Sequence, residues 1–444
     1  MPANDTTPRP RGLWAMAQYA AAHTPPSRNR AVDLYRAVAI CMVVLGHWLL
    51  IAPMVAGGEV QLTILLAEAP WTQYATWLFQ IMPVFFFVGG FANAVSWASA
   101  RHDPVQQRGW AATRLSRLLT PIVPLVLVWA AAAAIAKLTG VPLDLIDASS
   151  QAALVPVWFL AVYIVITVVV PVAARVWDAL GPASVLLLMA GAIAVDTLAF
   201  GFGMGWLRWT NYGFIWLAVH QLGFWWQSDR HRLPPWWLIS ALGVVWMIVL
   251  IPGLGFPVSM ISVPGEEISN TRPPTTAMLA IGLVQIGLLI AIERPIRRWL
   301  DGARVWASVI LLNQMIMTIY LWHLTAVIAL VGLSLLAGGI GLGTAPGTAQ
   351  WWVLRAPWLL ALVVTLVPFV ALFFRYESAG KRGPEALPGY GLAFVGALLA
   401  CAGLVMLALG AIGAHRALGF NVEAIVLVVV GVWLATRGLP ARQG

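Results

Sequence analysis

The first long apolar segment carries ionisable residues whose spacing could support acid–base chemistry. Asp33 and Arg36 stand at its start, and His47 follows eleven residues after Arg36. On a helix that turns about 100° per residue, this spacing places Arg36 and His47 on one face, about 16 Å apart. Asp33 lies within i,i+3 reach of Arg36. Since histidine suits proton transfer near neutral pH, we expect a catalytic histidine here. The alternative is an interhelical pair that only holds a bundle together.

A second group of candidates follows the second apolar segment. Arg114 and Arg117 stand three residues apart in a basic stretch that also contains Arg108. Arginine forks match the oxygens of phosphate groups, so the pair could clamp a nucleotide-bearing donor. The alternative interpretation is a topological anchor that contacts anionic lipids.

Further polar residues interrupt other apolar segments, where an ionisable group is costly and therefore a functional candidate. They are His323, His220, Asp196, Asn313 and Gln314. Their number favours a polar cavity entered from both sides of a bundle over an inert core.

A long polar loop over residues 263–275 admits two interpretations, a solvated connector or a lip over a pocket, and the composition slightly favours the connector. No phosphate-binding P-loop, Gly-x-Ser-x-Gly elbow or cluster with metal-ligand spacing occurs, so we expect no metal. Inverted repeats are not evident, which argues against a transporter.

These residues must be positioned by helices that cross a membrane. Of the 444 residues, 61% are hydrophobic and 10% are charged, and the mean hydropathy is +0.85. A soluble domain carries about 25% charged residues. Runs long enough to cross the hydrocarbon core recur along the chain, which predicts an all-α, polytopic transmembrane bundle of about twelve helices. The expected spans are 34–55, 75–99, 118–138, 154–174, 183–200, 209–226, 236–254, 276–292, 305–335, 351–374, 390–413 and 420–436. The ninth is too long for one straight crossing and is expected to tilt or break.

The positive-inside rule sets the orientation of this bundle. With the N-terminus in the cytosol and twelve crossings, 20 of the 26 Lys and Arg residues fall on the cytosolic side and 5 on the other. Both termini are then cytosolic. We expect residues 1–30 to form a disordered cytosolic tail, 31–380 the main membrane domain, and 381–444 two additional helices with a short tail.

Six short motifs in order resemble the acyltransferase-3 family of bacterial membrane acyltransferases. They are Asp33 with Arg36-x10-His47, Met82-Pro-Val-Phe-Phe-Phe-Val-Gly-Gly-Phe91, Arg114-x-x-Arg117-Leu with Pro121, Trp158-Phe-Leu-x-x-Tyr163, Glu293-Arg-Pro295 and Tyr320-Leu-Trp-His323. Gly89 stands where a serine is common. The elements at His220-Gln-Leu-Gly223 and Ser269-Asn-Thr look like an actinobacterial branch. Members typically have ten helices, so the last two helices depart from the pattern.

The resemblance implies transfer of an acyl group, often acetyl, from coenzyme A to a hydroxyl of a glycan, glycolipid or secondary metabolite. It places the enzyme in the bacterial cytoplasmic membrane, with a cytosolic donor and an acceptor on the outer face or in the membrane. Arg36, Arg114 and Arg117 would hold the donor phosphates, and Asp33 would position Arg36. His47 would act as general base or carry the acyl group, and His323 would orient the acceptor or stabilise the oxyanion. No nucleic acid partner is implied.

Two other functions stay open on the sequence alone. A twelve-helix transporter or flippase would move a solute without acyl transfer. A scaffold that has lost activity would not bind coenzyme A thioesters.

Overall fold

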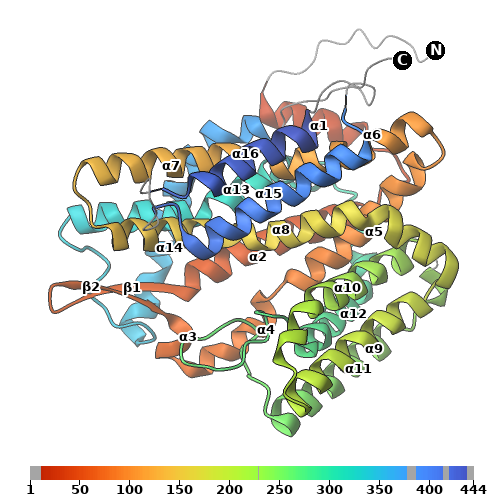
Figure 1. Ribbon diagram of the computed structural model, residues 1–444, viewed down its shortest axis with the longest axis horizontal. Coiled ribbons are helices and arrows are strands. Elements are labelled where there is room, and N and C mark those ends of the chain that lie inside the picture. Colours follow the sequence, from red (N-terminus) through yellow and green to blue (C-terminus); the bar gives the residue numbers. More distant parts are fainter. Residues whose placement is uncertain (1–11, 229, 378–386, 414–419, 438–444) are drawn as a thin grey trace.

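The computed structural model describes residues 12–228, 230–377, 387–413 and 420–437, and within them helices build almost the whole fold (Figure 1). The α-helices are α1 Leu13–Ala22, α2 Arg30–Leu50, α3 Leu65–Glu68, α4 Thr76–Phe79, α5 Met82–Ala100, α6 Pro104–Leu119, α7 Ile122–Leu138, α8 Leu143–Leu180, α9 Ala183–Asp196, α10 Asn211–Ser228, α11 Trp236–Ile248, α12 Thr276–Trp299, α13 Ala303–Leu336, α14 Ala349–Phe373, α15 Tyr390–Gly410 and α16 Val422–Thr436. Short turns of 3-10 helix include η1 Pro70–Ala75 and η6 Phe374–Tyr376, and β1 Ile51–Ala56 pairs with β2 Glu59–Ile64.

A helix occupies each of the twelve expected spans. Among the described residues, ten helical segments are long and apolar enough to cross a membrane. α10 and α16 fall outside that set: α16 has 15 residues, and α10 carries polar residues that are buried against its neighbours. The prediction of a polytopic helical bundle is confirmed. The expected boundary after residue 380 lies outside the described residues. Within the expected N-terminal tail, α1 is helical and residues 1–11 are outside the described part.

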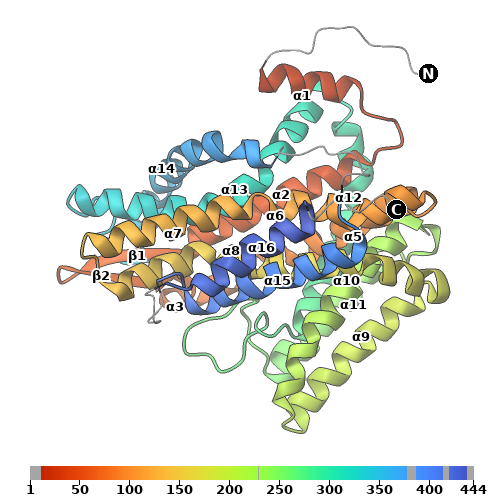
Figure 2. The same ribbon diagram turned by 45° about the horizontal axis from the view of Figure 1, so that its top comes forward.

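The helices form two groups. In Figures 1 and 2, α7, α8, α13, α15 and α16 run close to the long axis of the molecule, whereas α9 to α12 form an inclined group beside them. α2 and α5 lie between the groups: α2 packs against α13 and α5, and α5 packs against α10. α13 has 34 residues, which is about 51 Å of helix and longer than the hydrocarbon core. It is continuous, so the expected break in the ninth span does not occur.

The first span ends earlier than predicted. Residues 51–55 were expected to continue the helix, but α2 ends at Leu50 and the chain enters an antiparallel hairpin in which Ile51 pairs with Ile64 and Ala56 with Glu59. Pro53 cannot continue a helix because it lacks an N–H group. Gly57 and Gly58 both have positive φ angles of 62° and 85°, as a two-residue hairpin turn requires.

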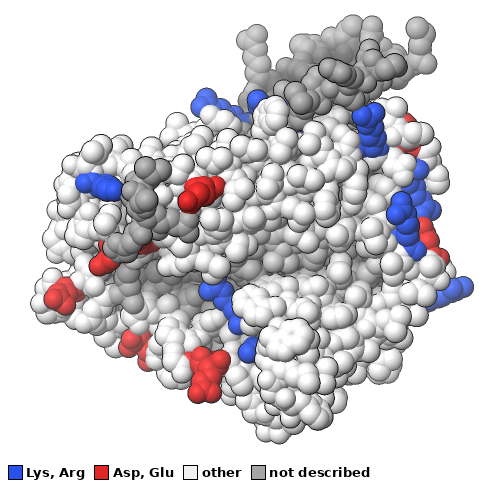
Figure 3. Space-filling model, viewed as in Figure 1, with Lys and Arg blue, Asp and Glu red and all other residues white. Residues whose placement is uncertain are grey.

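On the face in Figure 3, most charged side chains lie toward the two ends of the bundle and a few basic ones lie near the middle, but most of the surface between the ends is a broad uncharged belt. Large apolar side chains are exposed on the outer helices, among them Leu186, Val245, Val353 and Val364. A soluble protein rarely exposes apolar surface on this scale. The belt is the surface that a bilayer would cover.

The contact between α5 and α10 depends on glycine. A Cβ atom added to Gly223 would overlap the carbonyl oxygen of Phe87 and lie 2.7 Å from the amide nitrogen of Phe91. Gly90, on the facing helix, meets the backbone of His220 in the same way. Backbone atoms cannot move aside like the end of a flexible side chain, so the two helices approach closely only without side chains at these points.

We predict that Gly223→Ala destabilises the protein by about 1–3 kcal/mol through overpacking. The thermal midpoint of the detergent-solubilised protein should fall by several degrees. Gly213→Ala in the same helix is the matched control, because nothing lies within 4 Å of the added Cβ. Equal midpoints for the two variants would contradict this account of the packing.

Candidate active site

Two histidines from different helices meet in the interior. Nδ1 of His47 on α2 lies 2.9 Å from Nε2 of His323 on α13, and the two rings are nearly parallel at 12°. The indole N–H of Trp48 donates to the carbonyl oxygen of His323 at 3.0 Å. The two residues that follow Gly46 therefore both bond to one residue of α13, which sets the register of the two helices.

The hydrogen bonds determine which nitrogens of the neutral pair carry protons. Nδ1 of His323 lies 2.6 Å from the carbonyl oxygen of Tyr320, and a carbonyl can only accept, so this nitrogen donates. Nε2 of neutral His323 is then an acceptor, and Nδ1 of His47 donates to it. Nε2 of His47 is left with a free lone pair. The arrangement presents one basic nitrogen, oriented by a second histidine and a backbone carbonyl.

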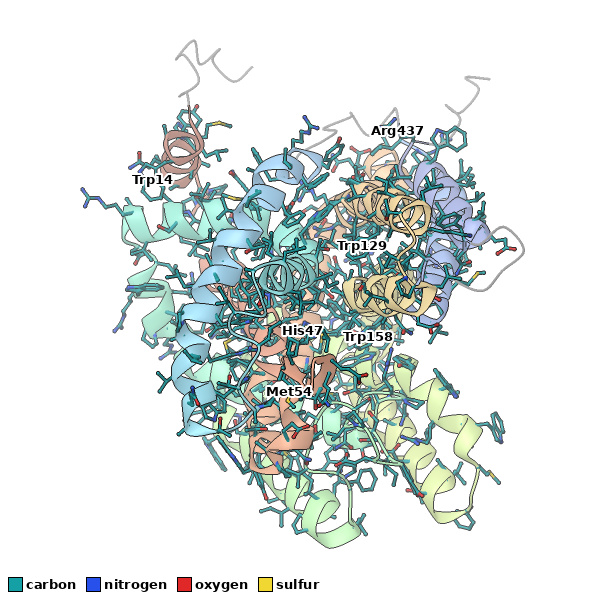
Figure 4. The ribbon with its side chains drawn as sticks, turned by 90° about the vertical axis from the view of Figure 1, so that its left-hand side faces the viewer. Trp14, His47, Met54, Trp129, Trp158 and Arg437 are labelled. Carbon is teal, nitrogen blue, oxygen red and sulfur yellow. The ribbon has the colours of Figure 1, made fainter. Side chains whose placement is uncertain are left out.

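His47 lines a cavity of about 610 Å³. Its walls come from α2, α8 and α13, and its rim from η1, α14 and the loop before α12; they include Trp71, Trp158, Phe159, Tyr320 and Trp352. Figure 4 looks onto the hairpin end of the bundle and places His47 and Trp158 near its centre. Ile51 of β1 and Trp71 of η1 line the cavity together with His47, so the cavity lies beside the part of the molecule that carries the hairpin.

Arg36 lies toward the opposite end of α2. Its guanidinium donates to Oδ1 of Asn313 through Nε at 3.0 Å and Nη2 at 2.8 Å, and Nη2 pairs with Asp33 at 3.0 Å. Asn313 in turn donates to the carbonyl oxygen of Asp33 at 3.0 Å, and Arg28 pairs with the Asp33 carboxylate at 2.7 Å. Asp33 thus lies between two arginines and holds both.

Arg36 and His47 face the same neighbour, as the helical spacing predicted. Their partners Asn313 and His323 stand ten residues apart on α13, which is about 15 Å along its axis. Both side chains therefore lie along one seam between α2 and α13, and the imidazole is not turned toward the lipid-facing surface.

The basic stretch lies beside this seam. Arg114 on α6 donates to the carbonyl oxygen of Ala92 at 2.8 Å, and its Nε is buried without a hydrogen-bond partner. Arg117 and Arg36 are close enough for their charges to act on Arg114. In the described part of the chain, neither Arg114 nor Arg117 forms an ion pair with a carboxylate. Three cations therefore gather here, two of them without a counter-ion.

Several other polar candidates have structural partners instead. The Asp196 carboxylate accepts from the Asn211 amide at 2.8 Å and from the backbone N–H of Thr276 at 2.7 Å, so it caps the start of α12. His220 lies 3.2 Å from the Asn93 amide on α5. Neither Asp196 nor His220 lines the cavity beside His47, whose walls are mostly apolar.

The loop over residues 263–275 contributes to the rim. Thr271 and Arg272 line the cavity together with the preceding Ser262. The loop region is tied to the segment before α5, because the Thr76 hydroxyl accepts from the N–H of Met260 at 2.9 Å and the Gln80 amide donates to the carbonyl oxygen of Met260 at 3.2 Å. The geometry favours the lip over the solvated connector.

Two residues near the seam were not singled out from the sequence. Arg355 on α14 is 6% exposed and donates to the carbonyl oxygens of Trp48 and Ile51, so it fixes the end of α2 directly after His47. The Glu377 carboxylate accepts from the backbone N–H groups of Met317 and Thr318, both at 3.1 Å, and burial raises its pKa to about 7. Both residues stand at or beyond the ends of an apolar segment. A charged residue at such a position usually indicates only on which side of the membrane the segment ends.

Gly89 stands where a serine is common in the family that the sequence resembles, and in this chain Tyr163 fills the space beside it. A Cβ atom added to Gly89 would lie 2.7 Å from the Tyr163 hydroxyl and 2.8 Å from its ring.

We predict that Gly89→Ser lowers the yield of folded protein, and that a second change, Tyr163→Val, recovers part of the loss by making room. Size-exclusion profiles of the two variants and of Tyr163→Val alone would test this coupling. A loss that Tyr163→Val leaves unchanged would show that another contact is responsible.

Comparison with known proteins identifies a family that matches most of the chain. The model of a family described as an acyltransferase domain matches residues 29–375, a range that contains the histidine pair, the arginine cluster and every residue that lines the cavity. Searches of curated proteins and of solved structures found no match. Since the matched range covers most of the chain, this multi-pass membrane protein belongs to the acyltransferase-3 family, whose members are O-acyltransferases.

Proposed function

We propose that this enzyme transfers an acyl group, with acetyl as the first candidate, from a coenzyme A thioester on the cytosolic side of a bacterial cytoplasmic membrane to an acceptor hydroxyl in the cavity beside His47. The observation that carries the proposal is the position of His47. Its free nitrogen lies at the cavity, and the seam between α2 and α13 leads from it to the arginine cluster. Donor and acceptor would thus approach one base from opposite ends of the bundle.

The donor would be held by its phosphates. Arg36, Arg114 and Arg117 lie at the end of the seam that the charge distribution assigns to the cytosol. Guanidinium groups bind phosphate oxygens through charge-assisted hydrogen bonds. The buried, unpaired Nε of Arg114 supports this role, since a group of this kind gains most from an anionic partner. The pantetheine arm would then extend along the seam toward His47.

The chemistry would be general base catalysis at Nε2 of His47. This nitrogen takes the proton of the acceptor hydroxyl while the oxygen attacks the thioester carbonyl. The tetrahedral intermediate collapses with cleavage of the C–S bond, and the departing thiolate takes the proton from His47. An acyl group carried transiently on the same nitrogen is the alternative route, and it would be detected as a labelled enzyme when no acceptor is present.

His323 would act as a positioning residue in this mechanism. Both of its ring nitrogens are already engaged, one by His47 and one by the carbonyl oxygen of Tyr320, and its side chain does not line the cavity. These contacts favour a role in orienting His47 and stabilising its protonated form over the direct contact with acceptor or oxyanion that the resemblance suggests.

We predict that His47→Ala lowers acyl transfer at least about 10²–10⁴-fold, the usual contribution of a general base. Membranes are supplied with labelled acetyl-CoA, and the measurement is the amount of acetyl label that is incorporated and then released by mild base. His102→Ala is the matched control, since His102 is exposed in a turn far along the chain from the seam. Equal incorporation by His47→Ala and wild type would remove His47 from the chemistry.

We predict that Arg114→Gln and Arg117→Gln each raise the KM for acetyl-CoA by about tenfold, because each loses a charge-assisted hydrogen bond to phosphate. The exposed Arg175 on α8 provides the control variant Arg175→Gln. Acetyl-pantetheine, which lacks the nucleotide phosphates, should serve wild type and both cluster variants equally. A loss of the same size with this truncated donor would show that the arginines do not act through the phosphates.

A further inference from the structure

The walls of the cavity beside His47 contain polar side chains, but most of their hydrogen-bonding groups are already used. The hydroxyls of Thr72, Thr76 and Tyr320 donate to the backbone carbonyls of Ala69, Gln73 and Pro156, at 2.6, 2.5 and 2.7 Å. The Thr271 hydroxyl donates to the carbonyl oxygen of Met260. Ser262 pairs with the hydroxyl of Ser269 at 2.8 Å.

The Gln80 amide is also committed on its donor side. Its nitrogen donates to the carbonyl oxygen of Met260 at 3.2 Å and to the Thr271 hydroxyl at 3.3 Å. Inside the described cavity, the side-chain donors left for a ligand are the indole N–H groups of Trp71, Trp158 and Trp352. The acceptors left are Nε2 of His47, the Gln80 amide oxygen and the lone pairs of the Thr72 and Tyr320 hydroxyls, whose protons are already donated. The guanidinium of Arg272 is free as well, but it lies at the exposed rim.

The remaining surface of the cavity is apolar. It is formed by aliphatic and aromatic side chains of several elements, which include Val43, Leu50, Leu65, Val155 and Phe79. A polyhydroxylated sugar buried here would lose its water and find few partners, which is unfavourable for every hydroxyl left unpaired. An apolar body would gain from the same burial.

We infer that the acceptor is a lipophilic alcohol: its apolar body fills this cavity and a single hydroxyl reaches Nε2 of His47. This inference rests on the proposed function and narrows its acceptor class from any hydroxyl compound to one whose buried part is not a sugar. At the rim, Trp71 and Trp352 form an aromatic pair with ring centroids 6.0 Å apart, a separation at which the rings are in contact; this pair adds to the apolar surface available to the acceptor.

A binding experiment without donor tests the inference independently of catalysis. The purified full-length protein in phosphatidylcholine nanodiscs is irradiated with a diazirine-bearing long-chain primary alcohol, and separately with a diazirine-bearing disaccharide. Mass spectrometry of the peptides locates the label. The alcohol should label segments that line the cavity, such as residues 65–76 and 152–159, and unlabelled octanol should compete. Labelling of these segments by the disaccharide and not by the alcohol would overturn the inference.

Variants separate binding in the cavity from simple partition into the bilayer. Ala152 lines the cavity, and Ala152→Leu should reduce cavity labelling several-fold because it fills part of the space. Ala131→Leu on the exposed side of α7 makes the same change away from the cavity and should leave labelling unchanged. Equal labelling of both variants and wild type would mean that the probe reports only lipid-like partition, which would also overturn the inference.

A transfer assay then distinguishes failure of the inference from failure of the proposed function. With labelled acetyl-CoA and primary alcohols from butanol to octanol, each added methylene should lower the apparent KM by about fourfold until the cavity is full. Ester formed on the disaccharide alone would overturn the acceptor class and leave the acyltransferase intact. Cavity labelling by the alcohol with no ester on any acceptor would instead argue against the proposed chemistry.

Discussion

A polar group inside a bilayer has no water with which to pair, and the seam between α2 and α13 is organised by that constraint. His47 bonds to His323, Trp48 bonds to the backbone of the same residue, and Arg36 bonds to Asn313. A shift of one helix along the other would leave all of these groups unpaired at once. The register of the two helices and the orientation of the imidazole are therefore consequences of one requirement, the pairing of buried polar groups.

Both ends of α2 are held by contacts from elsewhere in the chain, which makes the seam rigid. At its start, Asn29 accepts from the N–H of Ala31 and donates to Glu293 at 3.1 Å, and Glu293 also pairs with Arg230. At its end, Arg355 donates to the carbonyl oxygen of Trp48 in the last turn and to that of Ile51, the residue that follows the helix. Glu293, part of a motif shared with the family, thus acts on the site by fixing the start of the helix that carries Arg36 and His47. A reacting group on a helix held in this way is positioned before any ligand arrives.

The sequence predicted the features that follow from local periodicity. Hydropathy identified the twelve helical segments, and a rotation of 100° per residue placed Arg36 and His47 on one face. It did not predict the pairing of His47 with His323, because nothing local relates residues 276 positions apart. Residues 51–55, the first strand of the hairpin apart from its last residue, were predicted to be helical because their apolar side chains suit a membrane span as well as a strand. Arg355 and Glu377 were missed for a related reason. A charged residue at the end of a span fits the expected membrane orientation whether or not it also has a partner within the bundle, so the sequence does not distinguish the two cases.

The two helices beyond the matched domain, α15 and α16, contribute no residue to the proposed site, but they pack against helices that form it. α15 and α16 pack tightly on each other, since a Cβ atom on Gly403 would lie 2.6 Å from the carbonyl oxygen of Ala424. Their outer contacts are with α6 and α8, and Tyr390 donates to the carbonyl oxygen of Val168 at 2.6 Å. α6 carries Arg114 and Arg117, and α8 carries Trp158 in the cavity wall. No described residue of α15 or α16 lines the cavity. The pair therefore packs against the two helices that carry the proposed donor and acceptor contacts, and the proposed reacting groups all lie within residues 29–375.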